Sequence, residues 1–255
     1  MVLMTSTAMG LNHGFGNHKV HTMDHSKKDV KEVKMFKKEK KMRKEILERK
    51  EKIKRCLHER MKNYKRFRAL ALKSGINNPE GFKYAKLYIV HGAYAILNFL
   101  NLIKVDIMCS NIPNETKEKV LDEIEEIVRS LQEKITKVNE STTPEELKNG
   151  VRNLREYWKG VRPKVRVYVE LLIVSKLENI VKRAEIVGLR LANKSIDVDE
   201  YFKHVNRTKE ILNKAMNKIS NGQDAMDDVR EAKKELRMAF RVLKKIYREK
   251  LFAVV

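Results

Sequence analysis

The chain has 255 residues, with 56 Lys and Arg against 34 Asp and Glu, and a formal net charge of +22 at pH 7. Four prolines and 7% aromatic residues are few for a sheet protein of this length and favour long helices. A hydrophobic fraction of 42% is enough to form a core, which excludes a chain that is disordered throughout. Two cysteines exclude a disulfide-rich scaffold.

The opening residues, MVLMTSTAMGLNHGFGNH, have the features of the last third of a secretion signal. Ser6, Ala8 and Gly10 are small residues that suit cleavage after Ala8 or Gly10, whereas a basic start and most of an apolar run are missing. We therefore expect residues 1–25 to be a clipped signal remnant followed by a flexible His-rich segment. The alternative is an irregular cytosolic N-terminus.

Four histidines in this segment form a candidate metal site: His13, His18, His21 and His25. Imidazoles in a flexible segment bind Cu(II), Ni(II) or Zn(II), but this spacing matches no closed zinc motif. The alternative is a His-rich tail without a metal. We expect no resident cofactor and no catalytic residues.

Residues 26–73 are predicted to form one long basic helix. Between Lys27 and Lys73 there are 21 basic and seven acidic residues, a net charge of +14. Acids four residues before bases, such as Glu51 before Arg55, support an exposed helix. Apolar residues at helical spacing in the second half predict a stripe that faces the core: Ile46, Ile53, Leu57, Met61, Tyr64, Phe67 and Leu70. The helix should be free at its start and packed at its end, with Gly75 as its stop signal.

The predicted polyanion-binding residues lie in the first half of this helix: Lys37, Lys38, Lys40, Lys41, Arg43 and Lys44. Their excess charge favours an anionic partner, which is a surface polymer, lipid head groups or nucleic acid. The alternative is a solvated helix face without a partner. The acidic stretch 114–148, with a net charge of −4, neutralises only part of this excess.

Five further helices follow. Asn78 and Pro79 start an apolar helix to about Cys109, which we expect to be the central one and a core helix rather than a membrane span. An acidic helix covers about 115–138. Thr143 and Glu146 form a capping box before a helix that should run towards Leu191. The last two helices end near residues 220 and 251.

One proline interrupts the pattern of the long fourth helix. Pro163 should kink or split this helix near Gly160. Trp158, the only tryptophan, lies just before it and favours a packing anchor over a ligand platform. The predicted fold is an all-α, elongated antiparallel bundle of about six helices. We expect a bundle over 26–192 and a C-terminal hairpin over 193–255 packed on it.

Four N-glycosylation sequons occur, at Asn114, Asn139, Asn193 and Asn206.

The run TTPEELKNGVRNLREYWKGVRPKVR, with the preceding NIPNETKEKVLDEIEEIVRSLQEKI, is similar to segments of uncharacterised, predicted-secreted helical proteins of thermophilic archaea. This resemblance covers residues 77–191 and implies a surface or secreted location, but no activity and no functional residues.

We therefore expect a non-enzymatic structural or interaction protein, secreted or at the cell surface, whose basic helix engages an anionic partner. The alternative is an intracellular, nucleic-acid-associated protein in the cytoplasm. Homo-oligomer formation is left open, and the sequence indicates no small-molecule substrate.

Overall fold

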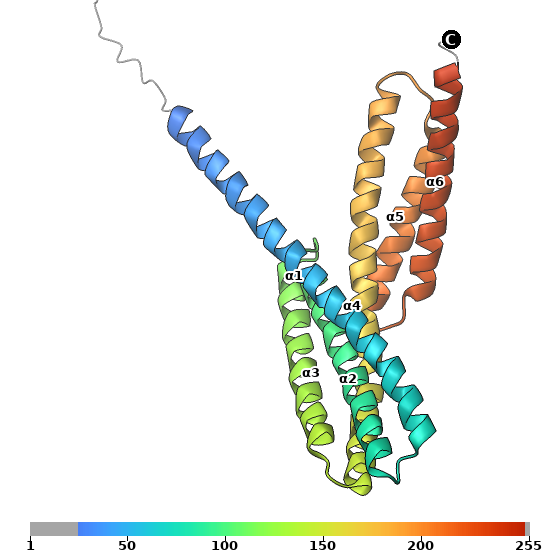
Figure 1. Cartoon of the computed structure of the whole chain (residues 1–255). Helices are drawn as coiled ribbons and strands as arrows, with labels where there is room; N and C mark the ends of the chain where they lie inside the picture. The colour runs from blue at the N-terminus through green and yellow to red at the C-terminus, as the bar shows by residue number, and fades with distance from the viewer. Residues whose placement is uncertain (1–24, 253–255) are drawn as a thin grey trace, which may run out of the picture. The chain divides into compact units, whose positions relative to one another are not determined.

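The computed structural model describes residues 25–252, with side chains described over 40–249, and this part of the chain contains helices and no strands (Figure 1). The prediction of an all-α protein is therefore confirmed. The six helices, in chain order, are α1 (His25–Ser74), α2 (Pro79–Met108), α3 (Asn114–Glu140), α4 (Pro144–Ala192), α5 (Asp199–Ser220) and α6 (Met226–Phe252).

The chain divides into two compact units, residues 1–45 and 46–255, and the boundary lies inside α1. The first unit contains the start of α1. The second contains the rest of α1 and all of α2 to α6, so the α5–α6 hairpin shares a unit with the helices before it.

Local sequence signals set the ends of several helices. The Asn78 side chain accepts a hydrogen bond of 2.6 Å from the backbone N–H of Gly81 and so caps α2. At α4, the Thr143 hydroxyl accepts the N–H of Glu146 at 3.2 Å, and the Glu146 carboxylate accepts the N–H of Thr143 at 3.3 Å. Gly75 follows α1 with φ +72°, a conformation that favours glycine. These features confirm the predicted caps and the predicted stop.

Pro163 was expected to kink or split α4 near Gly160; the helix is continuous through Pro163, so the split does not occur. Proline removes one backbone hydrogen bond from a helix, and that loss must be offset by packing. Val165 and Tyr168, two and five residues after the proline, are each 3% exposed and hold that part of the helix against the core.

The helix with the most neighbours is α4 rather than the more apolar α2, which the sequence indicated as central. Helix α4 contacts α2, α3, α5 and α6. Figure 1 shows α2 and α3 beside its first half, and α5 and α6 beside its second half. Its length of 49 residues allows it to take part in both groups of helices.

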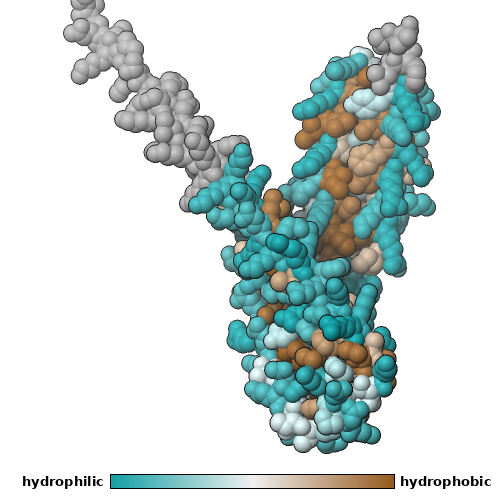
Figure 2. All heavy atoms as spheres, in the orientation of Figure 1, coloured by the Kyte–Doolittle hydropathy of each residue, from teal (hydrophilic) through white to brown (hydrophobic). Residues whose placement is uncertain are grey.

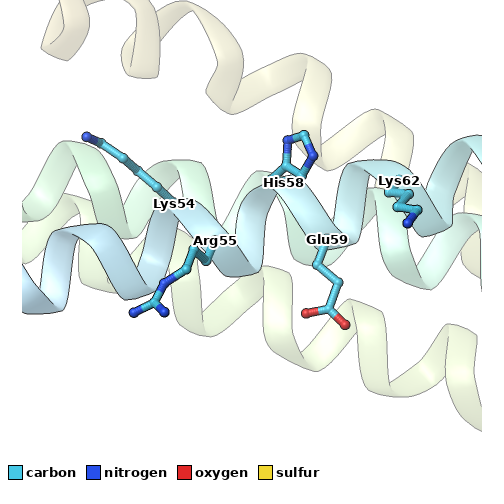
Figure 3. A pocket seen from close by; sticks show the side chains of 5 residues that line it. All are labelled: Lys54, Arg55, His58, Glu59 and Lys62. Carbon is cyan, nitrogen blue, oxygen red and sulfur yellow. The ribbon is translucent and has the colours of Figure 1, made fainter.

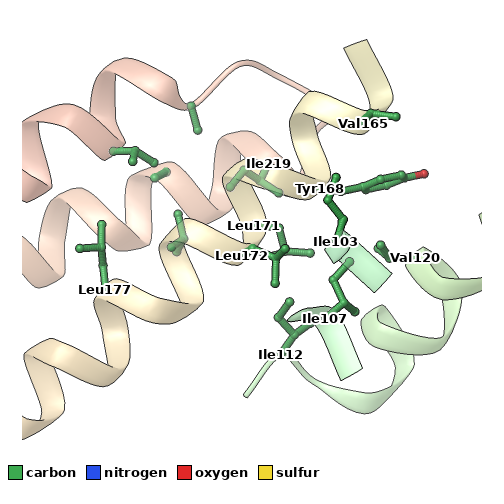
Figure 4. Packing of buried hydrophobic residues seen from close by; sticks show 14 of the residues in the cluster. Ile103, Ile107, Ile112, Val120, Val165, Tyr168, Leu171, Leu172, Leu177 and Ile219 are labelled. Atoms are coloured by element: carbon green, nitrogen blue, oxygen red, sulfur yellow. The ribbon is translucent and has the colours of Figure 1, made fainter. Parts of the chain in front are cut away.

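One hydrophobic core runs through these two groups of helices. Figure 4 shows its middle part, where side chains of α4 meet those of α2, α3 and α5. The residues in contact there include Ile103 and Ile107 of α2, Val120 of α3, Tyr168, Leu171 and Leu172 of α4, and Ile219 of α5. The hairpin and the preceding helices are thus joined by buried side chains along α4.

Helix α1 lies against α2 with a half-buried face. Six of the seven residues of its predicted apolar stripe are half-buried, and the seventh, Met61, is 41% exposed. The stripe was predicted to face the core, and its side chains are partly covered but remain partly accessible. Gly92 of α2 permits the close approach, because a Cβ atom there would lie 2.9 Å from the Tyr64 ring.

Helix α2 is the one helix among residues 25–252 that is long and apolar enough to cross a membrane by length and composition alone. The core helix of a soluble protein passes the same test. Ten residues of α2, among them Leu100 and Ile107, are buried against the other helices.

A second accessible apolar surface lies between α4 and α6. Figure 2 shows apolar side chains gathered between these helices. Exposed large apolar residues on them are Ile180, Ile186, Leu189, Phe240 and Tyr247.

Candidate polyanion-binding site

The side chains of α1 described by the structure carry a large basic excess. From Lys40 to Lys73 there are 15 Lys and Arg against four Glu. Every side chain from Lys40 to Glu45 is exposed. Lys41 lies 3.9 Å from Glu45, with side chains 80% and 63% exposed. An exposed pair of this kind is worth at most about 1 kcal/mol, so it does little to withhold Lys41 from a partner.

Four of the six predicted binding residues are thus placed on an exposed segment of α1: Lys40, Lys41, Arg43 and Lys44. Lys37 and Lys38 belong to the same helix, but their side chains lie outside the described part of the chain.

Further exposed basic residues follow along α1, and the sequence-based selection missed them because it stopped at Lys44. Figure 3 shows Lys54, Arg55, His58, Glu59 and Lys62 along a shallow depression on the helix surface. Lys54 donates a hydrogen bond to Glu51 at 2.6 Å. Among side chains from Lys40 to Glu249, no carboxylate lies within 4.0 Å of the lysines at positions 52, 62 and 65.

Two basic residues of α1, Lys50 and Arg60, have a structural role instead. Lys50 forms an ion pair with Asp106 of α2, and Lys176 of α4 binds the other oxygen of the same carboxylate at 2.9 Å. Burial by itself raises the pKa of Asp106, but hydrogen bonds from both lysines outweigh it and hold the pKa below its usual range. These contacts fasten the middle of α1 to α2 and α4.

The second attachment centres on Arg60 and His91. The Arg60 guanidinium lies 4.7 Å from the centre of the Tyr94 ring and 3.2 Å from Nδ1 of His91. The His91 ring stacks on Phe67 with 5.3 Å between ring centres. Burial lowers the pKa of His91, and Arg60 lowers it further, while Glu59 opposes this effect. Because Arg60 can only donate, this contact requires a neutral His91 whose Nδ1 accepts.

A hollow of about 1270 Å³ lies among α3, α4 and the α5–α6 turn. Several of its charged groups bind one another. Lys164 lies 3.3 Å from Glu123. Arg166 bridges two carboxylates, that of Asp224 and that of Glu170, of which Glu170 is fully buried. The arrangement joins α4 to the turn before α6, which is a structural role.

The predicted metal site cannot be placed. His13, His18 and His21 lie outside the described residues, and His25 begins α1 with its side chain outside them. Among described residues, no group of three or more His, Cys, Asp and Glu side chains is arranged to hold a metal ion. Cys56 and Cys109 are free and exposed.

The four sequon asparagines are all exposed, but their hydroxyl residues differ. Thr116 and Ser195, which complete the sequons of Asn114 and Asn193, are exposed. Ser141, which completes the sequon of Asn139, is 4% exposed. Thr208, which completes the sequon of Asn206, is fully buried and donates to the carbonyl of His204 at 2.8 Å.

Comparison with protein-family models, with curated proteins and with solved structures finds no significant match.

Proposed function

We propose that this is a non-enzymatic helical interaction protein, secreted or at the cell surface, that binds an anionic polymer through α1. One observation carries the proposal: 15 basic against four acidic residues from Lys40 to Lys73, on a helix whose side chains are all exposed from Lys40 to Glu45. A polymer with regularly spaced negative charges complements such a helix along its length.

Binding of this kind is driven by the release of counterions from the polymer. It is tight at low salt and weakens steeply as the salt concentration rises. Little sequence preference is expected, because the segment from Lys37 to Arg55 has no aromatic residue on which a base could stack.

The test compares two variants with equal charge. The first replaces the six predicted binding residues (Lys37, Lys38, Lys40, Lys41, Arg43 and Lys44) with Gln. The matched control replaces six exposed basic residues of α6 (Lys234, Arg237, Arg241, Lys244, Lys245 and Arg248) with Gln. Both changes remove six positive charges, so the overall charge of the two proteins remains equal.

The ligands are heparin and two DNA duplexes of different sequence. The α1 variant should bind all three roughly tenfold or more weakly at low salt, while the α6 variant stays near wild type. Equal losses in both variants would show that net charge, not α1, determines binding. A strong preference for one duplex would instead support the intracellular nucleic-acid alternative.

A further inference from the structure

An apolar groove lies where the second half of α1 crosses α2 beside the start of α4. Its volume is about 630 Å³, within the range of about 300 to 1000 Å³ that is usual for small-molecule sites. Its lining includes Leu57 and Met61 of α1, Ile96 and Phe99 of α2, and Leu154 and Trp158 of α4. All of these residues belong to the unit 46–255.

The polar groups of the groove are concentrated around Tyr88. The hydroxyl groups of Tyr64 and Tyr88 lie 3.3 Å apart, and their rings are 4.8 Å apart between centres. Arg155 lines the same groove. Hydrogen bonding to Tyr64 and burial raise the pKa of Tyr88, and the nearby guanidinium groups of Arg68 and Arg155 oppose the rise. The groove therefore carries two adjoining phenol groups and one arginine, Arg155, and Arg68 adds a second positive charge nearby.

The groove is also long. On α2 its lining runs from Tyr88 to Phe99, eleven residues apart, which is about 16 Å along the helix axis at about 1.5 Å per residue. An extended alkyl chain matches the length, and a negatively charged head group matches the arginines.

We infer that this groove binds a single-chain amphiphile with an anionic head group, of the fatty-acid class. Its alkyl chain lies against Trp158 and Phe99, and its carboxylate accepts hydrogen bonds at the end formed by Tyr64, Tyr88 and Arg155. This site is separate from the basic surface of α1, so either proposal can fail without the other.

The single tryptophan gives a direct measurement. A fatty acid with bromine on its alkyl chain should quench Trp158 fluorescence saturably, at concentrations where the fatty acid is monomeric and no vesicles are present. Arg155→Gln should weaken binding of the acid roughly tenfold, because a hydrogen bond to a charged group is lost. The same variant should bind the corresponding brominated alcohol, which has no negative charge, within twofold of wild type.

Two further variants separate the groove from other apolar surfaces. Val151→Phe places a larger side chain in the groove lining and should abolish binding of both acid and alcohol, with circular dichroism as the check on folding. Leu189→Gln changes an exposed residue on the face between α4 and α6 and should leave binding unchanged.

Several outcomes would overturn the assignment. Quenching that does not saturate, or that needs vesicles, would show partition into lipid rather than a binding site for a single amphiphile. Equal weakening of acid and alcohol by Arg155→Gln would show that the arginine does not bind the head group. Quenching that survives Val151→Phe in a folded protein would place the ligand elsewhere.

Discussion

Two glycines of α4, Gly160 and Gly188, occupy opposite environments. A Cβ atom at Gly188 would lie 2.6 Å from Cζ of Phe202 and 2.9 Å from Cε1 of Tyr201. Tyr201 is fully buried, and its hydroxyl donates to the carbonyl of Ala184 at 2.8 Å, so its ring has little room to move. At Gly160, by contrast, no atom lies within 4 Å of an added Cβ. The absence of a side chain at Gly188 thus allows α4 and α5 to pack closely.

Alanine substitutions at the two positions should therefore have opposite effects on the free energy of unfolding. Gly188→Ala should destabilise the protein by about 1 to 3 kcal/mol, because overpacking outweighs the better helix propensity. Gly160→Ala should stabilise it by roughly 0.5 to 1 kcal/mol, because alanine loses less conformational entropy in a helix. Urea denaturation measures both values. A Gly188→Ala protein as stable as wild type would mean that α4 and α5 are not so closely packed.

At the scale of elements, α1 differs from the other helices because its contact with α2 is half-buried and rich in polar and aromatic groups. The contact at Arg60 depends on a neutral His91, whose pKa is lowered mainly by burial. A base with a lowered pKa in the folded state binds its proton more readily after the contact opens. The contribution of His91 to the stability of this contact is therefore complete above the unfolded pKa of about 6.5. It is lost as pH falls towards the folded pKa.

The attachment of α1 to α2 should accordingly weaken below about pH 6.5. Amide hydrogen exchange over residues 57–70, corrected for intrinsic rates, should show less protection at pH 5.5 than at pH 7.5. His91→Phe keeps a ring that can stack on Phe67 but cannot be protonated, so this difference should largely disappear. His58→Gln, at an exposed position of the same helix, is the control and should retain it. If the His91→Phe protein showed the full pH effect, a group other than His91 would be its cause.

The helix boundaries could be predicted because they depend on neighbouring residues. Asn78, Thr143 and Gly75 act on backbone groups within a few positions, so their pattern is visible in the sequence. The continuity of α4 through Pro163 could not be predicted, since it depends on burial against helices distant in the chain.

The candidate sites also differ in how far the sequence could predict them. The basic excess of α1 is a local property, and four of the residues selected from it are exposed as expected. The structural use of Lys50 and Arg60 depends on Asp106 and Tyr94 of α2, and no spacing rule connects these residues. The apolar groove combines side chains of three helices, so Trp158 was predicted only as a packing residue.

At the scale of the whole molecule, a net charge of +22 would attract any polyanion, and α1 is not the only basic element. Helix α6 also carries exposed basic residues, and its Lys245–Glu249 pair at 3.9 Å is similar to the Lys41–Glu45 pair of α1. The central claim is therefore about location: the polymer contacts α1, and the charge elsewhere adds only a general attraction.

The most direct test is the salt dependence of binding to duplex DNA by wild type and the two six-residue variants. The slope of log K against log salt falls by about 0.9 for each phosphate contact that is lost, so the α1 variant should have a slope smaller by up to about five. The α6 variant, with the same net charge, should keep the wild-type slope. Equal slopes in the two variants, whether both reduced or both unchanged, would contradict the assignment of the binding site to α1.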